Sequence, residues 1–137
     1  MIIVSLCARR YLIRRNYFVV TTATSYGKGV YFARDFLYSS RKMYSPPDKN
    51  GIKYIFQCKV LTGEFVNGKP DHVEPPSKKG LIRFNSVVDN ADNPMIFVVF
   101  KDAQAYPEYL ISFTWLGLFE FSLKWNVWYG IDIGNDI

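Results

Sequence analysis

The sequence is poor in the residues that build metal centres and disulfide frameworks. It has one histidine, His72, and two cysteines, Cys7 and Cys58, among 137 residues. The cysteines lie in separate apolar runs without a CxxC spacing. We therefore expect neither a metal site nor a disulfide, and we interpret both thiols as reduced core residues of a nuclear or cytoplasmic protein. His72 lies among prolines, where a solvated loop residue is expected.

Long hydrophobic runs are also missing. No stretch of ~18 uncharged apolar residues occurs, and Glu120 and Lys124 interrupt the aromatic tail, so we expect no membrane span. The apolar run at the N-terminus has no basic residues ahead of it, which is the wrong order for a secretory signal. A mitochondrial presequence is a less favoured alternative. With 49% hydrophobic and 18% aromatic residues, the chain can fill the core of one domain.

Acidic residues are scarce in the first third of the chain. Residues 1–44 hold eight Lys or Arg against Asp35 alone, whereas residues 45–137 hold nine against eleven Asp or Glu. A basic excess suits a pyrophosphate or a nucleic acid, but a solvated face is the simpler interpretation. No nucleic-acid motif accompanies the arginines of residues 9–15, so we do not expect nucleic acid as a partner.

The residue pattern predicts an α+β domain. Strands are expected at about Val30–Phe32, Ile52–Val60, Met95–Phe100 and Tyr109–Phe113, with a helix near Arg34–Tyr44. The continuous apolar run Met95–Phe100 is typical of a strand buried on both faces. Because βαβ alternation is absent, we expect a mixed or antiparallel sheet.

Several shorter segments also carry structural signals. The run Ile2–Cys7 is β-prone, and the two glycines of Tyr26–Gly29 predict a close backbone approach. Ser45–Gly51 should end the helix in a surface loop. Asn67-Gly68 is a turn signal, and the three prolines of Lys69–Gly80 predict a loop.

The order of these segments resembles a known catalytic domain. The string YGKGVYFA begins at Tyr26 and is followed by KYIFQCKVLTGEF, HVEPPSK, MIFVVF and AYPEYLISF. This series resembles the C-terminal part of the poly(ADP-ribose) polymerase catalytic domain, and YGKGVYFA, VLTG, PPSK and QAYPEYLISF look most like the macrodomain-associated mono-ADP-ribosyltransferase subgroup. The resemblance implies an ADP-ribosyltransferase fold with a split sheet, incomplete at its N-terminal side. It divides the chain into an unrecognised segment, 1–25, a partial catalytic domain, 26–113, and an unrecognised aromatic tail, 114–137.

The resemblance also implies a site for NAD+, which would be a substrate. Tyr31 matches the motif tyrosine that lines the nicotinamide ribose and ring. Ser39 matches the serine that bonds the carboxamide, and Tyr44 the tyrosine that stacks on the nicotinamide face. These types suit a flat cationic ring and its amide. The NAD+ and nicotinamide contacts implied in this way are Tyr26, Gly27, Tyr31, Ala33, Ser39 and Tyr44.

The third catalytic motif position matches Leu110. In the family a glutamate there helps the acceptor hydroxyl react during chain growth, which leucine cannot do. The resemblance therefore implies the transfer of single ADP-ribose units. Glu108 lies two residues earlier, and strand alternation alone would put it on the same face as Leu110. A register shifted by two residues, with Glu108 at the motif position, stays open.

The first motif member, a His-Gly pair, has no counterpart before the YGKG turn, because His72 follows Tyr31. We therefore expect a truncated NAD+-dependent protein mono-ADP-ribosyltransferase, acting on acceptor proteins in its full form. One alternative is an inactive fragment with weak or no NAD+ binding, and a second is a basic nucleic-acid-binding module. The aromatic tail is expected to be unrelated sequence, with a partner-binding strip as the competing interpretation.

Overall fold

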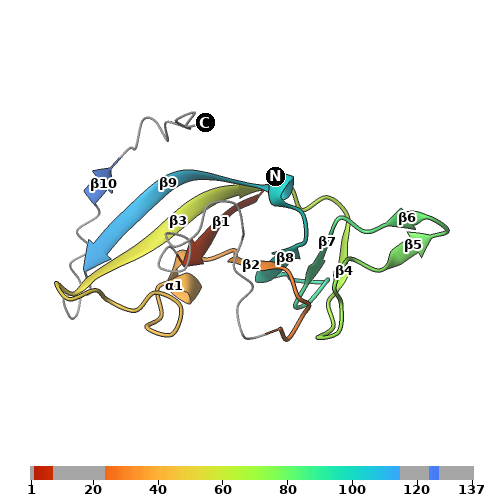
Figure 1. Ribbon diagram of the computed structural model, residues 1–137, viewed down its shortest axis with the longest axis horizontal. Helices are drawn as coiled ribbons and strands as arrows, with labels where there is room; N and C mark the ends of the chain where they lie inside the picture. The colour runs from red at the N-terminus through yellow and green to blue at the C-terminus, as the bar shows by residue number, and fades with distance from the viewer. Residues whose placement is uncertain (1, 8–23, 115–123, 127–137) are drawn as a thin grey trace, which may run out of the picture.

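The computed structural model describes residues 2–7, 24–114 and 124–126 (Figure 1). No helix in these ranges is long and apolar enough to cross a membrane. In chain order the elements are β1 (Ile2–Cys7), β2 (Val30–Ala33), α1 (Phe36–Ser39), β3 (Ile52–Val60), β4 (Phe65–Asn67), β5 (Ser77–Lys79), β6 (Ile82–Arg83), β7 (Ser86–Val88), β8 (Ile96–Val99), the 3-10 helix η2 (Asp102–Gln104), β9 (Ala105–Thr114) and β10 (Lys124–Asn126).

Most strands form one mixed sheet in the order β10-β9-β3-β1-β2-β8-β7-β4. All neighbours pair antiparallel except β4 and β7, which are parallel. Strand β1 pairs with β3 from Ile2↔Val60 to Cys7↔Ile55, but it meets β2 at the single pair Ser5↔Ala33. The sheet is therefore split into two halves that diverge from this junction, as Figure 1 shows. The β-prone N-terminal run is confirmed as a strand in the middle of the sheet.

The longest predicted strands are confirmed. Strand β3 has the predicted bounds, and β8 is buried at all of its positions, as a continuous apolar run requires. Strand β9 begins earlier than predicted, at Ala105, in spite of Pro107. The pairing of β9 with β3 shifts register between Gln57 and Cys58, and Pro107 pairs with Cys58 at this bulge, where a missing backbone N–H is tolerated.

The predicted helix over Arg34–Tyr44 is much shorter than expected. Only Phe36–Ser39 is α-helical, and turns follow it. The Ser40 hydroxyl donates to the Leu37 carbonyl oxygen at 2.9 Å, one of the local bonds by which serine competes with helix continuation. The Ser40 N–H still bonds the Phe36 oxygen, so the helix closes a single turn.

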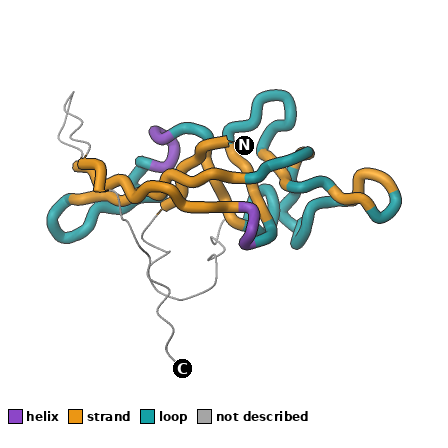
Figure 2. The backbone as a smooth tube through the Cα atoms, turned by 90° about the horizontal axis from the view of Figure 1, so that it is seen from above, coloured by secondary structure: helices purple, strands orange, loops and turns teal. Residues whose placement is uncertain are grey.

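Two loop predictions are wrong. The proline-rich stretch Lys69–Gly80 contains β5, which pairs with β6 in a two-stranded hairpin that projects from one end of the molecule (Figures 1 and 2). Asn67-Gly68 is no turn, because Asn67 ends β4 and the Gly68 N–H donates to the Val88 oxygen. A Cβ atom on Gly68 would lie 2.2 Å from the Tyr26 oxygen. Close approach, rather than a turn, requires glycine there.

Buried side chains cover both faces of the sheet. Phe32 of β2 packs with Cys58, Val60 and Val99 on one face. Its neighbour Ala33 packs on the other face with a cluster that includes Ile96 and Val98 of β8. We call this second side the Ala33 face. A fully buried side chain of this size contributes roughly 1.5–3 kcal/mol, so the sheet is held from both sides.

Helix α1 lies next to both β1 and β2. Phe36 at its start packs with Ile55, Ile111 and Phe113, and its ring centroid is 5.0 Å from that of Phe113. Tyr38, two residues later, packs on the Ala33 cluster of the other half-sheet. The helix therefore contacts both halves of the split sheet.

Candidate functional site

The YGKG turn leads directly into β2 and lies against β8. A Cβ atom on Gly29 would lie 2.5 Å from the Val99 oxygen and 2.8 Å from Val98 Cγ1, so only glycine fits. The Lys28 N–H donates to the His72 oxygen at 2.7 Å, which joins the turn to the loop after β4. The predicted close approach is confirmed, and its partner is the neighbouring strand.

The hydroxyl of Tyr31 holds this turn. It accepts the Tyr26 N–H at 3.0 Å and donates to the Gly27 oxygen at 2.7 Å. Burial raises the pKa of Tyr31, so the hydroxyl keeps the proton that it donates. The ring lies 6.5 Å from the Tyr26 ring, tilted by 37°. Because the hydroxyl is committed to the turn, the Tyr31 ring is the part available to a ligand.

A second pair of tyrosines lies at the end of α1. The Tyr38 and Tyr44 rings are stacked, with centroids 5.0 Å apart and planes 21° apart, and their hydroxyls are 2.9 Å apart. The Arg41 guanidinium carbon lies over the Tyr38 ring, 4.8 Å from its centroid. The Tyr38 ring therefore has both an aromatic and a cationic neighbour. The hydrogen bond with Tyr44 raises the pKa of Tyr38 to about 12.

Most of the residues that the sequence assigned to NAD+ lie on the Ala33 face. Tyr26, Tyr31 and Tyr38 pack against one buried group, which comprises Ala33, Val87, Ile96 and Val98. Tyr44 joins this group through Tyr38, and we call Tyr26, Tyr31, Tyr38 and Tyr44 the tyrosine cluster. Gly27 is held by the Tyr31 hydroxyl, and Ser39, which is 5% exposed, follows Tyr38 at the end of α1. Sequence reasoning missed Tyr38 and Arg41; their three-residue spacing with Tyr44 is the signal that could have found them.

Leu110 does not join the tyrosine cluster. It pairs with Phe56 of β3, and Phe56 packs with Phe32 on the face opposite to Ala33. Strands β3 and β1 also lie between β9 and β2. The aliphatic side chain that the sheet places beside Ala33 is Ile96 of β8.

Glu108 lies in the bulge of β9. Tyr109 pairs with Gln57 and Pro107 with Cys58, which leaves Glu108 without a partner residue in the ladder. Its carboxylate forms an ion pair with Lys59, and this hydrogen bond raises the pKa of Lys59. The bulge breaks the alternation that would put Glu108 on the same face as Leu110.

The remaining singled-out residues have structural roles. Cys58 is a free, buried thiol, and burial raises its pKa to about 12, as expected of an unreactive core cysteine. The side chain of Cys7 lies outside the described residues. His72 is half-buried rather than solvated, and its Nδ1 accepts the Lys69 N–H at 3.3 Å. Within the described ranges, no three His, Cys, Asp or Glu side chains lie together in a way that could hold a metal ion.

The split sheet and the tyrosine cluster beside a YGKG turn define a particular catalytic-domain family. The family model of the poly(ADP-ribose) polymerase catalytic domain matches residues 3–115, and the chain belongs to this family. The match includes β1, ahead of the segment in which sequence motifs were recognised.

The curated relatives of the chain share one activity in their names. It is 46% identical over 94 residues to the human protein mono-ADP-ribosyltransferase PARP14, which covers 66% of this chain and 5% of that protein. The human mono-ADP-ribosyltransferase PARP12 is 46% identical over 93 residues, covering 66% of this chain and 13% of PARP12. Mouse PARP10, with the same activity in its name, is 42% identical over 91 residues, covering 65% of this chain and 10% of PARP10. The chain therefore spans a small part of these relatives.

A solved structure confirms the fold. The PARP domain of Arabidopsis RADICAL-INDUCED CELL DEATH1 superposes with a TM-score of 0.65 at 18% identity, covering 82% of this chain and 66% of that one. The predicted α+β ADP-ribosyltransferase fold with a mixed, split sheet is thus correct.

Proposed function

We propose that this chain serves NAD+-dependent protein mono-ADP-ribosylation, and that the tyrosine cluster holds the nicotinamide end of NAD+. The observation that carries the proposal is the stacked Tyr38–Tyr44 pair on the same face as Tyr31. Three curated relatives that bear this activity in their names support it. Acceptor proteins would receive ADP-ribose, and nicotinamide would leave.

The chemistry needs the residue types that are present. The nicotinamide ring of NAD+ carries a positive charge, and a tyrosine face attracts a cation while stacking on a flat ring. Tyr44 and Tyr31 would supply such faces, and the Ser39 hydroxyl would read the carboxamide. The glycosidic bond to the ring breaks with its electron pair moving to nicotinamide, which becomes neutral. An acceptor side chain then bonds the ribose carbon of an oxocarbenium-like transition state.

We propose that one ADP-ribose unit is transferred at each acceptor. Strand β8 sets Val98 beside Tyr31 and Ile96 beside Ala33, and both side chains are hydrocarbon. The sequence assigned the missing carboxylate to Leu110, whose side chain is hydrocarbon as well. A hydrocarbon side chain cannot orient or deprotonate a ribose hydroxyl for chain growth.

For the 137-residue chain alone we propose little or no transferase activity. No histidine precedes Tyr31 in its sequence. The 137 residues therefore lack the His-Gly element that, in the family, forms hydrogen bonds with the ribose and the carboxamide. Losing several bonds of about 1 kcal/mol each would weaken NAD+ binding by orders of magnitude. The competing proposal is a fragment that also lacks a nicotinamide site, and nicotinamide binding distinguishes the two proposals.

The experiment is a nicotinamide titration of the chain by saturation-transfer NMR. Binding that falls at least fivefold in Tyr44→Ala and is unchanged in Tyr106→Ala supports the proposal, since Tyr106 is 68% exposed on β9. Equal binding by both variants would show that the tyrosine cluster is not the site.

A further inference from the structure

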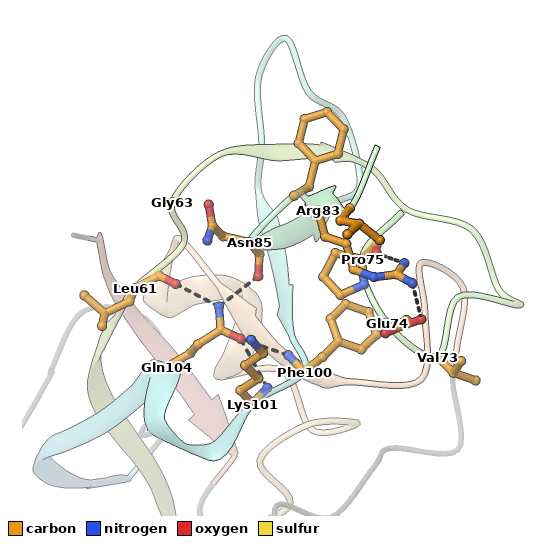
Figure 3. A pocket seen from close by; sticks show the side chains of 12 residues that line it. Leu61, Gly63, Val73, Glu74, Pro75, Arg83, Asn85, Phe100, Lys101 and Gln104 are labelled. Atoms are coloured by element: carbon orange, nitrogen blue, oxygen red, sulfur yellow. Dashed lines mark hydrogen bonds and ion pairs between the residues drawn. The ribbon is translucent and has the colours of Figure 1, made fainter. Parts of the chain in front are cut away.

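A groove of about 880 Å³ lies beside Phe100, and Figure 3 shows the side chains that line it. Three segments form it: the stretch after β3, the loop and hairpin from Val73 to Asn85, and the turn between β8 and β9. The proposed NAD+ site does not account for this groove, although Phe100 lines it and also packs against the buried group that carries Tyr26 and Tyr31.

The base of the groove is built by one side chain, Gln104. Its amide oxygen accepts the backbone N–H groups of Phe100 at 3.3 Å and Lys101 at 3.1 Å. Its amide nitrogen donates to the carbonyl oxygens of Leu61 at 3.1 Å and Asn85 at 2.8 Å. Figure 3 shows Gln104 between these groups. All three segments are therefore fastened together before any ligand binds, which lowers the entropy lost on binding.

The lining of the groove mixes polar and apolar side chains. Its aliphatic members are exposed: Leu61 is 58% exposed, Val73 65% and Leu81 102%. Exposed aliphatic side chains beside polar ones suit contact with another protein. Leu81 lies in the β5–β6 hairpin, which forms a two-stranded sheet by itself. Each of its strands therefore has an unpaired edge that can bond an extended peptide backbone.

The charged side chains that line the groove indicate which charge a bound peptide should carry. Glu74 is the carboxylate of the lining, and it forms an ion pair with Arg83 at 2.8 Å. A second nitrogen of Arg83 donates to the Pro75 oxygen at 3.1 Å. For the Lys101 ammonium group, no ion pair or hydrogen bond is formed with the described residues. Among the described residues this positive charge has no partner, and a carboxylate of a ligand would complement it.

We propose that this groove docks an extended segment of the acceptor protein in which an acidic residue lies between aliphatic ones. The aliphatic side chains would contact Leu61, Val73 and Leu81, while the carboxylate would pair with Lys101. The identity of the partner as an acceptor rests on the proposed function. The groove lies next to the proposed NAD+ site, because Phe100 lines the groove and also lies against the YGKG turn. A Cβ atom on Gly27 of that turn would lie 3.0 Å from the Phe100 ring. A peptide in the groove would therefore be close to the site of transfer.

The test uses two capped synthetic peptides, Ser-Leu-Glu-Val-Leu-Ser and the same peptide with Gln in place of Glu. Each is titrated into the isotope-labelled 137-residue chain, without NAD+, and followed by amide NMR shifts. We expect shifts at Val73, Leu81 and Lys101, and binding of the Glu peptide at least threefold tighter than that of the Gln peptide. Lys101→Gln should abolish this preference. The matched control Lys49→Gln, at an exposed lysine in the loop before β3, should keep it.

Three results would overturn the docking proposal: equal binding of the two peptides, a preference that survives in Lys101→Gln, or shifts confined to other surfaces. Tighter binding of a nucleotide such as AMP, with loss in Lys101→Gln, would also overturn it and identify a nucleotide groove. Nicotinamide shifts at Tyr31 and Tyr44 are read in a separate titration. Peptide binding without a nicotinamide response would support the groove as a peptide site, but it would count against the proposed function and against the peptide being an acceptor. A nicotinamide response without peptide binding would count against the docking segment alone.

Discussion

The hydroxyls of Tyr38 and Tyr44 lie 2.9 Å apart above stacked rings whose centroids are 5.0 Å apart. This bond fixes the orientation of Tyr44, the ring proposed to stack on nicotinamide. Arg41 lies over the Tyr38 ring, 4.8 Å from its centroid. Tyr38 therefore acts as a positioning residue, whose own ring need not touch the ligand.

Removing the Tyr38 hydroxyl should loosen Tyr44 without removing either ring. In Tyr38→Phe we expect nicotinamide binding to fall about two- to fivefold, which corresponds to a hydrogen bond of about 0.5–1 kcal/mol. The dissociation constant from NMR titration measures it. Tyr106→Phe, at an exposed ring, serves as the control. If Tyr38→Phe binds as tightly as the unaltered chain, the hydroxyl pair does not position Tyr44.

The same pair predicts a pH dependence. Its hydrogen bond raises the pKa of Tyr38 from 10.0 to about 12, so the folded chain holds this proton more tightly than the unfolded chain. The resulting stability is fully present below pH 10 and is lost as the pH rises through the interval between these two values. Alkaline titration by tyrosinate absorbance should show a late-titrating tyrosine that disappears in Tyr38→Phe. An unchanged titration curve in that variant would contradict the assignment.

Gly29→Ala should prevent the close packing of β2 on β8. A Cβ atom would lie 2.5 Å from the Val99 oxygen, which is backbone and cannot move aside without breaking the ladder. We expect a loss of about 3 kcal/mol or more of unfolding free energy in urea denaturation. Gly51→Ala is the comparison, because nothing lies within 4 Å of its Cβ and its φ of +78° alone gives a loss of about 1–2 kcal/mol. Equal losses in the two variants would refute the steric argument.

Gln104→Ala should destabilise the junction of the three groove segments. Four hydrogen bonds of its side chain would be lost, each worth about 0.5–1.5 kcal/mol. We expect a decrease of about 2–4 kcal/mol in unfolding free energy. Gln104→Glu retains the two acceptor bonds but sets a carboxylate oxygen against the carbonyl oxygens of Leu61 and Asn85, so it should lose at least as much. Denaturation of both variants beside exposed Asn50→Ala tests this, and Asn50→Ala should be the most stable of the three.

Product length tests the role of Glu108 in a longer parent enzyme that contains this segment. Because Glu108 lies in a β-bulge and is paired with Lys59, Glu108→Gln should leave single ADP-ribose units on the acceptor. Digestion of the modified protein followed by mass spectrometry detects ribosyl-ribose linkages. Their presence in the parent and absence in Glu108→Gln would show that Glu108 supports chain growth after all.

The sequence predicted those strands whose residue pattern is visible within a few neighbouring positions. Strands β3 and β8 followed from alternation and from a continuous apolar run, and Tyr31 followed from the motif around it. The β5–β6 hairpin escaped notice because Pro75 and Pro76 precede it directly and indicate a loop. Proline excludes ladder pairing only at its own position, so the strand begins at the next residue.

The place of Leu110 relative to the tyrosine cluster could not be predicted from the sequence for a different reason. Whether Leu110 faces Tyr31 depends on strand order and on the bulge in β9, and both are set by pairings between residues distant in the chain. The YGKG turn was visible because glycine reports a local steric demand. An aliphatic residue in a sheet carries no comparable mark of which face it occupies.

Helix α1 bridges the two halves of the split sheet. Phe36 is packed into the half formed by β3 and β9, and Tyr38 into the half formed by β2, β7 and β8. Within the described strands, the halves also meet at the pair Ser5↔Ala33 and where Phe32 packs on Cys58 and Val60 of β3. A ligand ring that stacks on Tyr44 would therefore contact a side chain held by the bridging helix. We expect amide hydrogens in both halves to exchange more slowly together when the site is filled.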